Sequence, residues 1–330
     1  MKKIILTLLL ASSVIINAQD EDKGTFTLSG TVDVYGTTNF AEGSGTPGIL
    51  IANPETANSF GLGFANTVFA YEKGKAGVVA DIAFGPKADD ANLAGAINQL
   101  YAYYKASEKV TFTAGQFNTF LGYEVISPAA NFNYTVSYLF NAGPFSHTGI
   151  KMDYAASEDL SFMLAFMNSH AISSADGNIG GEMQLGAQVG YKGQYLNFIY
   201  GGVDGSGITD NIFLDYTGGF DLSDSFFLGL NAAYSNSSDA DAGYQGVALY
   251  LQNTFSDTFA LGLRPEFFTY TSGAGDTSVS AFTLTARTSL TENLKLITDL
   301  RLDNSDDLII EAFPTEKSVT ALTIAAVYSF

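Results

Sequence analysis

The chain has 330 residues, 46% of them hydrophobic, and a formal net charge of −19 at pH 7. So acidic a chain repels the phosphates of nucleic acid, which is therefore not expected as a partner. There is no cysteine, so disulfide bonds cannot hold the fold together. Beyond the first residues, no apolar run reaches the ~18 residues that indicate a membrane-spanning helix.

The first residues predict a secretory signal peptide. Lys2 and Lys3 precede the apolar run 4–10, and the small residue Ala18 stands before Gln19. A basic start, a short apolar core and a small residue at the exit are typical of such a signal. The alternative of a membrane anchor needs ~20 apolar residues, more than this core has. We expect residues 1–18 to be removed and residues 19–330 to form a single domain.

The rest of the chain alternates apolar and polar residues in short segments, with polar turns between them. Alternation of this kind over several residues predicts strands that are wetted differently on their two faces. The predicted strands, in chain order, are residues 25–36, 59–72, 75–85, 97–106, 109–119, 144–155, 158–168, 182–192, 194–203, 209–220, 224–235, 243–255, 258–270, 277–290, 292–303 and 318–330.

The connections between these strands alternate in length. Residues 37–58 and 86–96 are long connections, whereas 73–74 and 107–108 are short turns. Short periplasmic turns and longer outer loops are typical of outer-membrane barrels, in which every backbone group pairs between strands. The sequence therefore predicts an all-β fold: a transmembrane antiparallel β-barrel of about 16 strands in an up-and-down meander, with both termini in the periplasm.

The two faces of single strands carry different side chains. In residues 292–303, leucines alternate with a face that holds Lys295, Asp299 and Arg301. A charge that faced lipid near the membrane midplane would cost about 2–4 kcal/mol, so we expect the charged face to line the lumen. A soluble sandwich has the same alternation with leucines inside. The signal peptide, the strand count and the aromatic last residue favour the membrane barrel.

The last strand ends on Tyr328 and Phe330, which lie on one face. Chain ends of soluble proteins usually fray into water, so an apolar strand that runs to the last residue indicates a membrane surface. We interpret Tyr328 and Phe330 as a sorting signal for the barrel-assembly machinery.

The connection 120–143 differs from an ordinary polar loop. It contains Phe132, Tyr134, Tyr138 and Phe140, and its one charged residue is Glu124. Such an apolar segment would form an adhesive patch in water. We expect it to fold into the lumen as a constriction, because a 16-strand barrel otherwise encloses a wide aqueous channel. The alternative is an external cap or a partner interface.

Three neighbouring strands place basic side chains on the expected lumen face. With Glu124 opposite them, these cations would set a transverse field across a narrow pore, and charged walls bias the passage of ions. The alternative is that the pairs Arg264–Glu266 and Arg301–Asp299 neutralise each other. The candidate pore and constriction residues are Glu124, Arg264, Arg287, Lys295, Arg301, Tyr134 and Phe132.

The two histidines do not indicate a reactive site. His147 falls on the expected lumen face and His170 in an outer loop, and neither has the carboxylate or cysteine spacing of a metal site. No Gly-x-Ser-x-Gly motif indicates a hydrolase. The acidic residues of the loops are interpreted as solvated charge. We therefore expect no cofactor, no metal and no enzymatic activity.

The central part of the chain resembles the porin family called putative β-barrel porin-2 (OmpL-like). The signal peptide and residue style also resemble those of exported Bacteroidetes proteins. The resemblance implies a porin-like barrel in the outer membrane and supplies no catalytic residues. The motifs that carry it are Gly115-Gln116-Phe117, Gly122-Tyr123-Glu124, Asn131-Phe132-Asn133-Tyr134 and Pro144-Phe145-Ser146-His147-Thr148-Gly149.

These observations together predict an outer-membrane channel for the passive diffusion of small hydrophilic solutes. Its expected partners are the lipid bilayer, the barrel-assembly machinery and the solutes themselves, with a homo-oligomer as a further option. The alternative is a non-conducting barrel whose outer loops, such as 37–58, bind a partner or a surface. A barrel hydrolase is a distant third.

Overall fold

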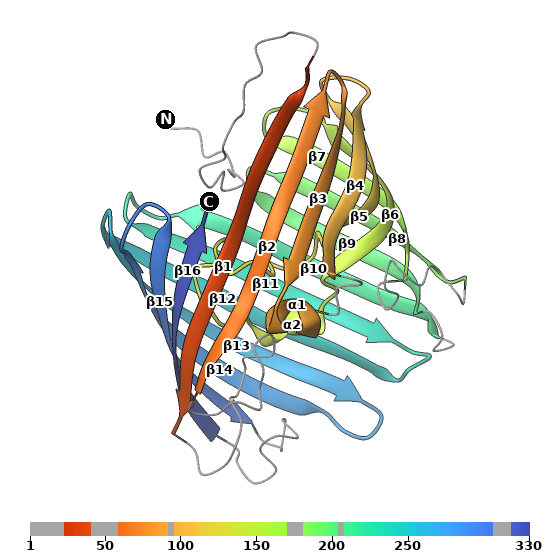
Figure 1. Cartoon of the computed structure of the whole chain (residues 1–330). Helices are drawn as coiled ribbons and strands as arrows, with labels where there is room; N and C mark the ends of the chain where they lie inside the picture. The colour runs from red at the N-terminus through yellow and green to blue at the C-terminus, as the bar shows by residue number, and fades with distance from the viewer. Residues whose placement is uncertain (1–22, 41–58, 92–95, 170–180, 204–207, 306–317) are drawn as a thin grey trace.

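A computed structural model describes residues 23–40, 59–91, 96–169, 181–203, 208–305 and 318–330. In these residues, sixteen strands form one closed antiparallel barrel (Figure 1). The predictions for the signal peptide 1–18, for His170 and for most of the connection 37–58 lie outside the described residues.

The strands follow one another with two short helices between them. Their bounds are β1 Thr25–Asn39, β2 Ser59–Lys73, β3 Ala76–Phe84, α1 Pro86–Asp90, β4 Ile97–Lys105, β5 Val110–Asn118, α2 Tyr138–Ala142, β6 Ser146–Ala155, β7 Leu160–Asn168, β8 Met183–Tyr191, β9 Gln194–Val203, β10 Ile208–Asp221, β11 Phe226–Ser237, β12 Ala242–Ser256, β13 Phe259–Ser272, β14 Thr277–Ser289, β15 Leu294–Ser305 and β16 Ser318–Ser329. No helix in the described part of the chain is long and apolar enough to cross a membrane.

Each strand pairs with its neighbours in the chain, and β1 pairs with β16 to close the ring. At this closure Val32 lies opposite Tyr328. The last residue continues the pairing, because Gly30 N–H donates to the Phe330 carbonyl at 2.9 Å and Phe330 N–H donates to the Gly30 carbonyl at 3.0 Å. The barrel has no free sheet edge, which is the condition for spanning a bilayer with strands. The predicted fold class is confirmed.

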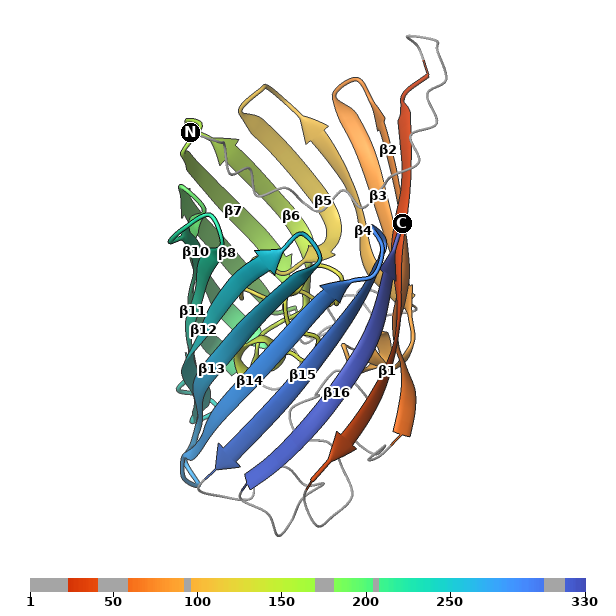
Figure 2. The same cartoon turned by 90° about the vertical axis from the view of Figure 1, so that its left-hand side faces the viewer.

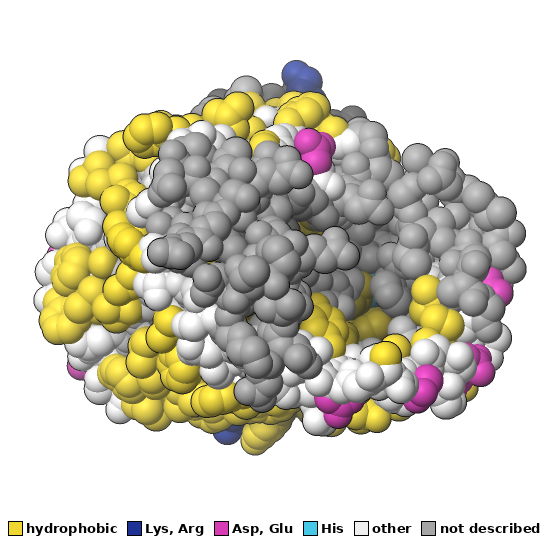
Figure 3. Space-filling model, turned by 90° about the horizontal axis from the view of Figure 1, so that it is seen from below, with side chains coloured by type: hydrophobic (Ala, Val, Ile, Leu, Met, Phe, Trp, Pro, Cys, Tyr) yellow, Lys and Arg dark blue, Asp and Glu magenta, His cyan; other side chains and the backbone are white. Residues whose placement is uncertain are grey.

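The two faces of the wall follow the predicted alternation. On β15, Leu300 is 43% exposed on the outer face, whereas Asp299 and Arg301 are 0% and 1% exposed inside. The short hairpins β2–β3 and β4–β5 lie at the upper end of the barrel in Figure 2. Seen from the opposite end, apolar side chains lie around the outside of the molecule (Figure 3). Lipid would contact this apolar outer surface.

Two segments between strands enter the barrel. Helix α1, between β3 and β4, packs against β2 and β3, and α2, between β5 and β6, packs against β12 and β13. The strands on which the two helices rest lie far apart around the ring. Both helices contribute buried side chains to apolar clusters inside the barrel.

Candidate functional site

The segment that connects β5 to β6, residues 119–145, lies inside the barrel and crosses it. Gly122 N–H donates to the Asp215 carboxylate on β10 at 3.0 Å. Asn133 Nδ2 donates to Thr285 Oγ1 on β14 at 2.5 Å. The Tyr134 hydroxyl donates to the Asp33 carboxylate on β1 at 2.6 Å. Because β1, β10 and β14 lie at different places around the ring, the segment spans the lumen. We call residues 119–145 the lumen loop.

A buried ion pair attaches the lumen loop to the wall. Arg264 Nη1 on β13 lies 2.5 Å from Glu124 Oε1, and the two side chains are 0% and 3% exposed. The other oxygen of Glu124 accepts from the backbone N–H and the hydroxyl of Ser137, at 2.7 and 2.5 Å. Arg264 donates further to the carbonyl oxygens of Thr135 and Val136, at 2.6 and 3.1 Å. The expected transverse field between Glu124 and Arg264 across an open gap is therefore not what the geometry shows, since the two groups touch.

A second buried pair lies on β15. Arg301 Nε lies 2.8 Å from Asp303 Oδ1, and Arg301 Nη1 donates to the Val136 carbonyl at 2.6 Å. The alternative pairs of the sequence analysis, Arg264–Glu266 and Arg301–Asp299, are not among the ion pairs within 4.0 Å in the described residues. Arg264 pairs with Glu124 and Arg301 with Asp303, because the backbone of the lumen loop occupies the other two carboxylates.

Those two carboxylates bind N–H groups of the lumen loop. Asp299 Oδ2 accepts from the backbone N–H groups of Tyr134 and Thr135, at 3.0 and 2.7 Å. Glu266 Oε1 accepts from the Leu139 N–H at 2.9 Å. A loop inside a barrel has no neighbouring strand to bind its backbone, so wall side chains must satisfy it. The sequence analysis missed this role, although Glu266 on β13 and Asp299 on β15, both on the lumen face of their strands, were its signal.

Of the two remaining basic candidates, Arg287 contacts the lumen loop. Arg287 donates to the carbonyl oxygens of Asn131 and Ala129, the second at 3.2 Å. Its guanidinium lies 5.9 Å from the centroid of the Phe132 ring. Lys295 is half-buried on β15. The contacts of Arg287 with the lumen loop are therefore with carbonyl groups and an aromatic ring rather than with a carboxylate.

Tyr134 of the lumen loop contacts side chains of both β1 and α1. Its ring lies 5.8 Å from that of Tyr35, and the ammonium of Lys87 lies 3.4 Å from its centroid. The Asp33 carboxylate, which accepts from the Tyr134 hydroxyl, also accepts from the Phe64 N–H at 2.8 Å. The pairing of β1 with β2 is irregular between Val32 and Val34, and Asp33 stands at this irregularity. Tyr134 therefore ties the lumen loop to a bulged part of the wall.

Helix α1 is a second segment inside the lumen, which the sequence analysis missed because it expected residues 86–96 to form an ordinary outer loop. Lys87 is 3% exposed. The chain turns inward at Gly85, whose φ is 100°, and a Cβ there would lie 2.6 Å from the Gly63 carbonyl oxygen. The polar sequence of α1 gave no signal of burial. The helix belongs to a cluster of Phe64, Ala83, Ala88, Ala91, Ile126, Val136 and Phe140.

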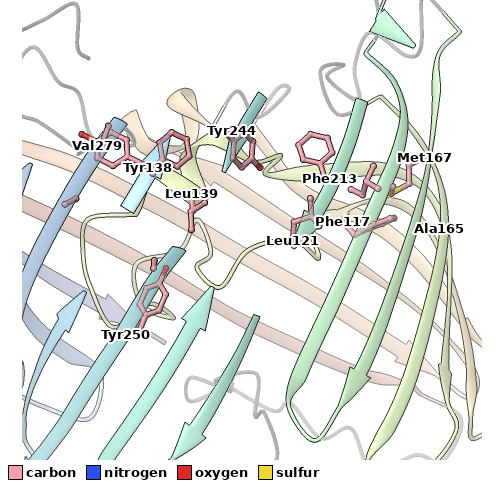
Figure 4. Close-up of a cluster of buried hydrophobic side chains, with 14 of the residues drawn as sticks. Phe117, Leu121, Tyr138, Leu139, Ala165, Met167, Phe213, Tyr244, Tyr250 and Val279 are labelled. Atoms are coloured by element: carbon pink, nitrogen blue, oxygen red, sulfur yellow. The ribbon is translucent and has the colours of Figure 1, made fainter. Parts of the chain in front are cut away.

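A larger apolar cluster joins the lumen loop to the far wall. Leu121 and Leu139 of the loop meet side chains from β10 and β12, among them Phe213 and Tyr244 (Figure 4). His147 also lies inside, as expected, with Nε2 at 2.9 Å from Thr119 Oγ1. The interior at this level is therefore packed rather than lined by water alone.

The residues of the expected sorting signal lie at the closure of the barrel. Tyr328 is exposed on the outer face of β16. Phe330 follows it, and its ring touches Gly30, where a Cβ would lie 2.6 Å from Phe330 Cζ. Over the described residues, no group of His, Cys, Asp or Glu side chains could hold a metal ion.

A closed sixteen-strand barrel with an apolar outer face, a charged interior and a loop folded across its lumen has the architecture of a porin. A comparison with protein families agrees with this class. The chain belongs to the family described as "Putative beta-barrel porin-2, OmpL-like", whose model matches residues 25–330. The protein is an outer-membrane porin-type channel, and family and fold indicate a channel rather than an enzyme.

Solved structures share the fold at low identity. The anion-selective porin from Comamonas acidovorans has a TM-score of 0.65 and 11% identity, over 93% of this chain and 100% of that one. The outer membrane channel DcaP of Acinetobacter baumannii has a TM-score of 0.60 and 12% identity, over 94% of this chain and 99% of that one. The trimer form of in-vitro folded OmpT, an outer membrane protein of Vibrio cholerae, has a TM-score of 0.59 and 12% identity, over 94% of this chain and 100% of that one. No curated protein sequence matches the chain.

Proposed function

We propose that the protein lets small hydrophilic solutes diffuse passively across the outer membrane, with the lumen loop as the constriction. The observation that carries this proposal is the set of contacts from the lumen loop to β1, β10 and β14. A barrel of this strand number without a loop inside would leave a wide aqueous channel. The loop reduces the cross-section that solutes can use.

The lumen loop is held rigidly enough to act as a size filter. The buried pair Glu124–Arg264 and the N–H groups bound by Asp299 and Glu266 fix it at several points along its length. Fixed loops select by size and by the charge that lines the remaining space. Passage requires no covalent chemistry, so we assign no catalytic residue.

The test is a planar-bilayer recording on refolded, purified protein. Stepwise conductance increments support a channel, and a swelling assay with liposomes and sugars of increasing size gives the cut-off. Correctly folded protein that gives neither conductance steps nor sugar uptake would contradict the proposal. Heat-modifiable migration on a gel provides the folding control.

We further propose that residues 1–18 direct export and are cleaved, and that Tyr328 and Phe330 are read by the barrel-assembly machinery. Mass determination of the protein isolated from outer membranes tests the cleavage. The trimer form of OmpT supports a homo-oligomer for this fold, which cross-linking in membranes tests. The alternatives of a non-conducting binding barrel and of a hydrolase are not proposed.

A further inference from the structure

We propose that the lumen loop has a second role: it holds the barrel closed at the junction of its first and last strands. We call this junction the closure seam. It is the pairing of β1 with β16, from Gly30 opposite Phe330 to Asn39 opposite Ala321. One residue of the loop, Tyr134, contacts the wall on both sides of the closure seam. The inference does not depend on whether the barrel conducts.

The closure seam differs from the other strand pairings of the barrel. Every other pair of neighbouring strands is consecutive in the chain, so a connection keeps the two strands close together when their pairing opens. Strands β1 and β16 have no such connection, and a long chain between two segments makes their meeting entropically costly. Once separated, each strand would also present an unpaired edge. We therefore expect contacts that cross the closure seam to matter for keeping the barrel closed.

Tyr134 binds a strand on each side of β16 through hydrogen bonds. Its backbone N–H donates to Asp299 Oδ2 on β15 at 3.0 Å, and its hydroxyl donates to Asp33 Oδ1 on β1 at 2.6 Å. The N–H of Thr135 donates to the same oxygen of Asp299 at 2.7 Å. Strand β16 lies between β15 and β1 (Figure 2). These hydrogen bonds therefore connect β15 to β1 across the inner face of β16.

The ring of Tyr134 packs on the inner face of the closure seam. It belongs to one buried apolar cluster with Tyr35 on β1, Ile297 on β15, and Ala325 and Val327 on β16. Ala325 lies opposite Tyr35 across the closure seam and opposite Ile297 on its other side. Separation of β1 from β16 would expose these side chains to water, which is unfavourable for apolar surface. The cluster therefore favours the closed barrel.

The wall on the β1 side leaves room for the Tyr134 hydroxyl. The pairing of β1 with β2 is irregular at Asp33, whose Oδ2 accepts from the Phe64 N–H at 2.8 Å. A Cβ at Gly63 would overlap the Asp33 carboxylate and would lie 2.6 Å from the Tyr134 hydroxyl oxygen. A glycine inside a strand often marks a bulge or a close approach of other groups. Here the carboxylate and the hydroxyl occupy the space that Gly63 leaves.

Other contacts of the lumen loop follow the same division. Ser127 Oγ lies 3.4 Å from Thr31 Oγ1 on β1. On the other side, Arg287 of β14 donates to the Ala129 carbonyl at 3.2 Å. The part of the loop from residue 127 to residue 135 is therefore attached to the first strand and to strands near the end of the chain.

The experiment is hydrogen exchange of backbone amides in the refolded, complete protein in detergent. Tyr134→Phe removes the hydrogen bond to Asp33 and keeps the ring. We expect the amides that pair β1 with β16 to exchange at least about fivefold faster than in the wild type, the effect of one lost buried hydrogen bond on a local opening. The amides that pair β11 with β12 should keep their wild-type rates.

The matched control is Tyr123→Phe. This tyrosine belongs to the same loop, but its ring stacks on Tyr250 of β12, with 4.1 Å between the centroids. We expect Tyr123→Phe to leave exchange at the closure seam unchanged. Unchanged exchange there in Tyr134→Phe, or equal acceleration at the closure seam and between β11 and β12, would overturn the inference. Equal acceleration would mean that Tyr134 adds only to the overall stability of the barrel.

A disulfide across the closure seam provides a second test. The chain has no cysteine, and Val34 and Ala326 lie opposite each other in β1 and β16, at a spacing that a disulfide can bridge. In Tyr134→Phe with Val34→Cys and Ala326→Cys, oxidation should abolish the faster exchange, and reduction should restore it. If Tyr134→Phe alone does not assemble, oxidative refolding with the cysteine pair should recover the heat-modifiable barrel. Failure of the disulfide to compensate would contradict a role of Tyr134 at the closure seam.

Discussion

Arg264 and Glu124 are 140 residues apart in the sequence, yet their Nη1 and Oε1 atoms lie 2.5 Å apart inside the barrel. The pair joins strand β13 to the lumen loop, and neither charge reaches solvent. A buried charge that loses its partner is costly, so the two residues depend on each other for stability. Their contact links the stability of the barrel to the position of the loop.

Glu124→Gln should destabilise the protein by about 3–5 kcal/mol, because it leaves the Arg264 guanidinium buried and unpaired. Urea unfolding of the refolded protein in detergent measures this loss. The matched control is Lys192→Gln, which breaks the exposed pair with Asp159 at 3.8 Å and should cost at most ~1 kcal/mol. Equal losses in the free energy of unfolding of the two variants would show that the buried pair contributes no more to stability than the exposed pair does.

Deletion of residues 131–139 removes the part of the lumen loop that binds Asp299, Glu266 and Thr285. We expect single-channel conductance to increase roughly twofold or more, because an aqueous 16-strand channel opens when its filling is removed. Heat-modifiable migration must first show that the shortened barrel assembles. An assembled variant with the conductance of the wild type would contradict the role of the loop as a constriction. So would free reaction of a cysteine at Asn133 with bulky reagents on intact cells.

Arg287→Gln should raise the K⁺/Cl⁻ permeability ratio about twofold, since Arg287 contacts carbonyl groups and an aromatic ring but no carboxylate. Arg264 and Arg301 are less suitable for this test, because substituting them would leave the carboxylates of Glu124 and Asp303 buried without their ion-pair partners. Reversal potentials under a salt gradient measure the change. Lys109→Gln, in an exposed turn, is the control and should leave the ratio unchanged. An unchanged ratio in Arg287→Gln would show that this cation lies away from the ion path.

Lys87→Met should increase conductance, because the ammonium of Lys87 connects α1 to Tyr134 through the ring and the carbonyl oxygen, each at 3.4 Å. A cation on an aromatic face contributes up to about 2 kcal/mol when desolvated, so its loss should loosen the contact between the two inward segments. Single-channel recordings give the readout. Lys75→Met, in an exposed turn, controls for loss of a lysine. If the two variants conduct alike, α1 has no part in narrowing the passage.

Deletion of Phe330, or Phe330→Asp, should reduce the yield of assembled barrel in the outer membrane. The residue pairs with Gly30 through two backbone hydrogen bonds and completes the closure of β1 on β16. Phe330→Leu keeps an apolar side chain there and should assemble better than either variant. Heat-modifiable migration and outer-membrane yield are the measurements. Normal assembly of the aspartate variant would remove Phe330 from the sorting signal.

The sequence was sufficient for the strands, their number and their faces, because these depend on local alternation. Leu300 and Arg301 are neighbours, and one had to face lipid and the other the lumen whatever the rest of the chain did. The unusual composition of residues 120–143 likewise indicated a segment that avoids water. Such features can be derived from a few consecutive residues and the solvent on each side.

Only the tertiary structure decided which charges meet. Asp299 and Asp303 lie two residues to either side of Arg301 on the same face, and the pattern cannot distinguish them. Backbone N–H groups of the lumen loop occupy Asp299, which leaves Asp303 for the arginine. The same competition assigns Glu124 to Arg264. Burial of α1 also depended on a surface that only the assembled lumen supplies. The sequence by itself therefore determined which residues of the wall face lipid and which face the lumen. Which lumen carboxylates pair with arginines was decided by the backbone N–H groups of the lumen loop, which come from a distant part of the chain.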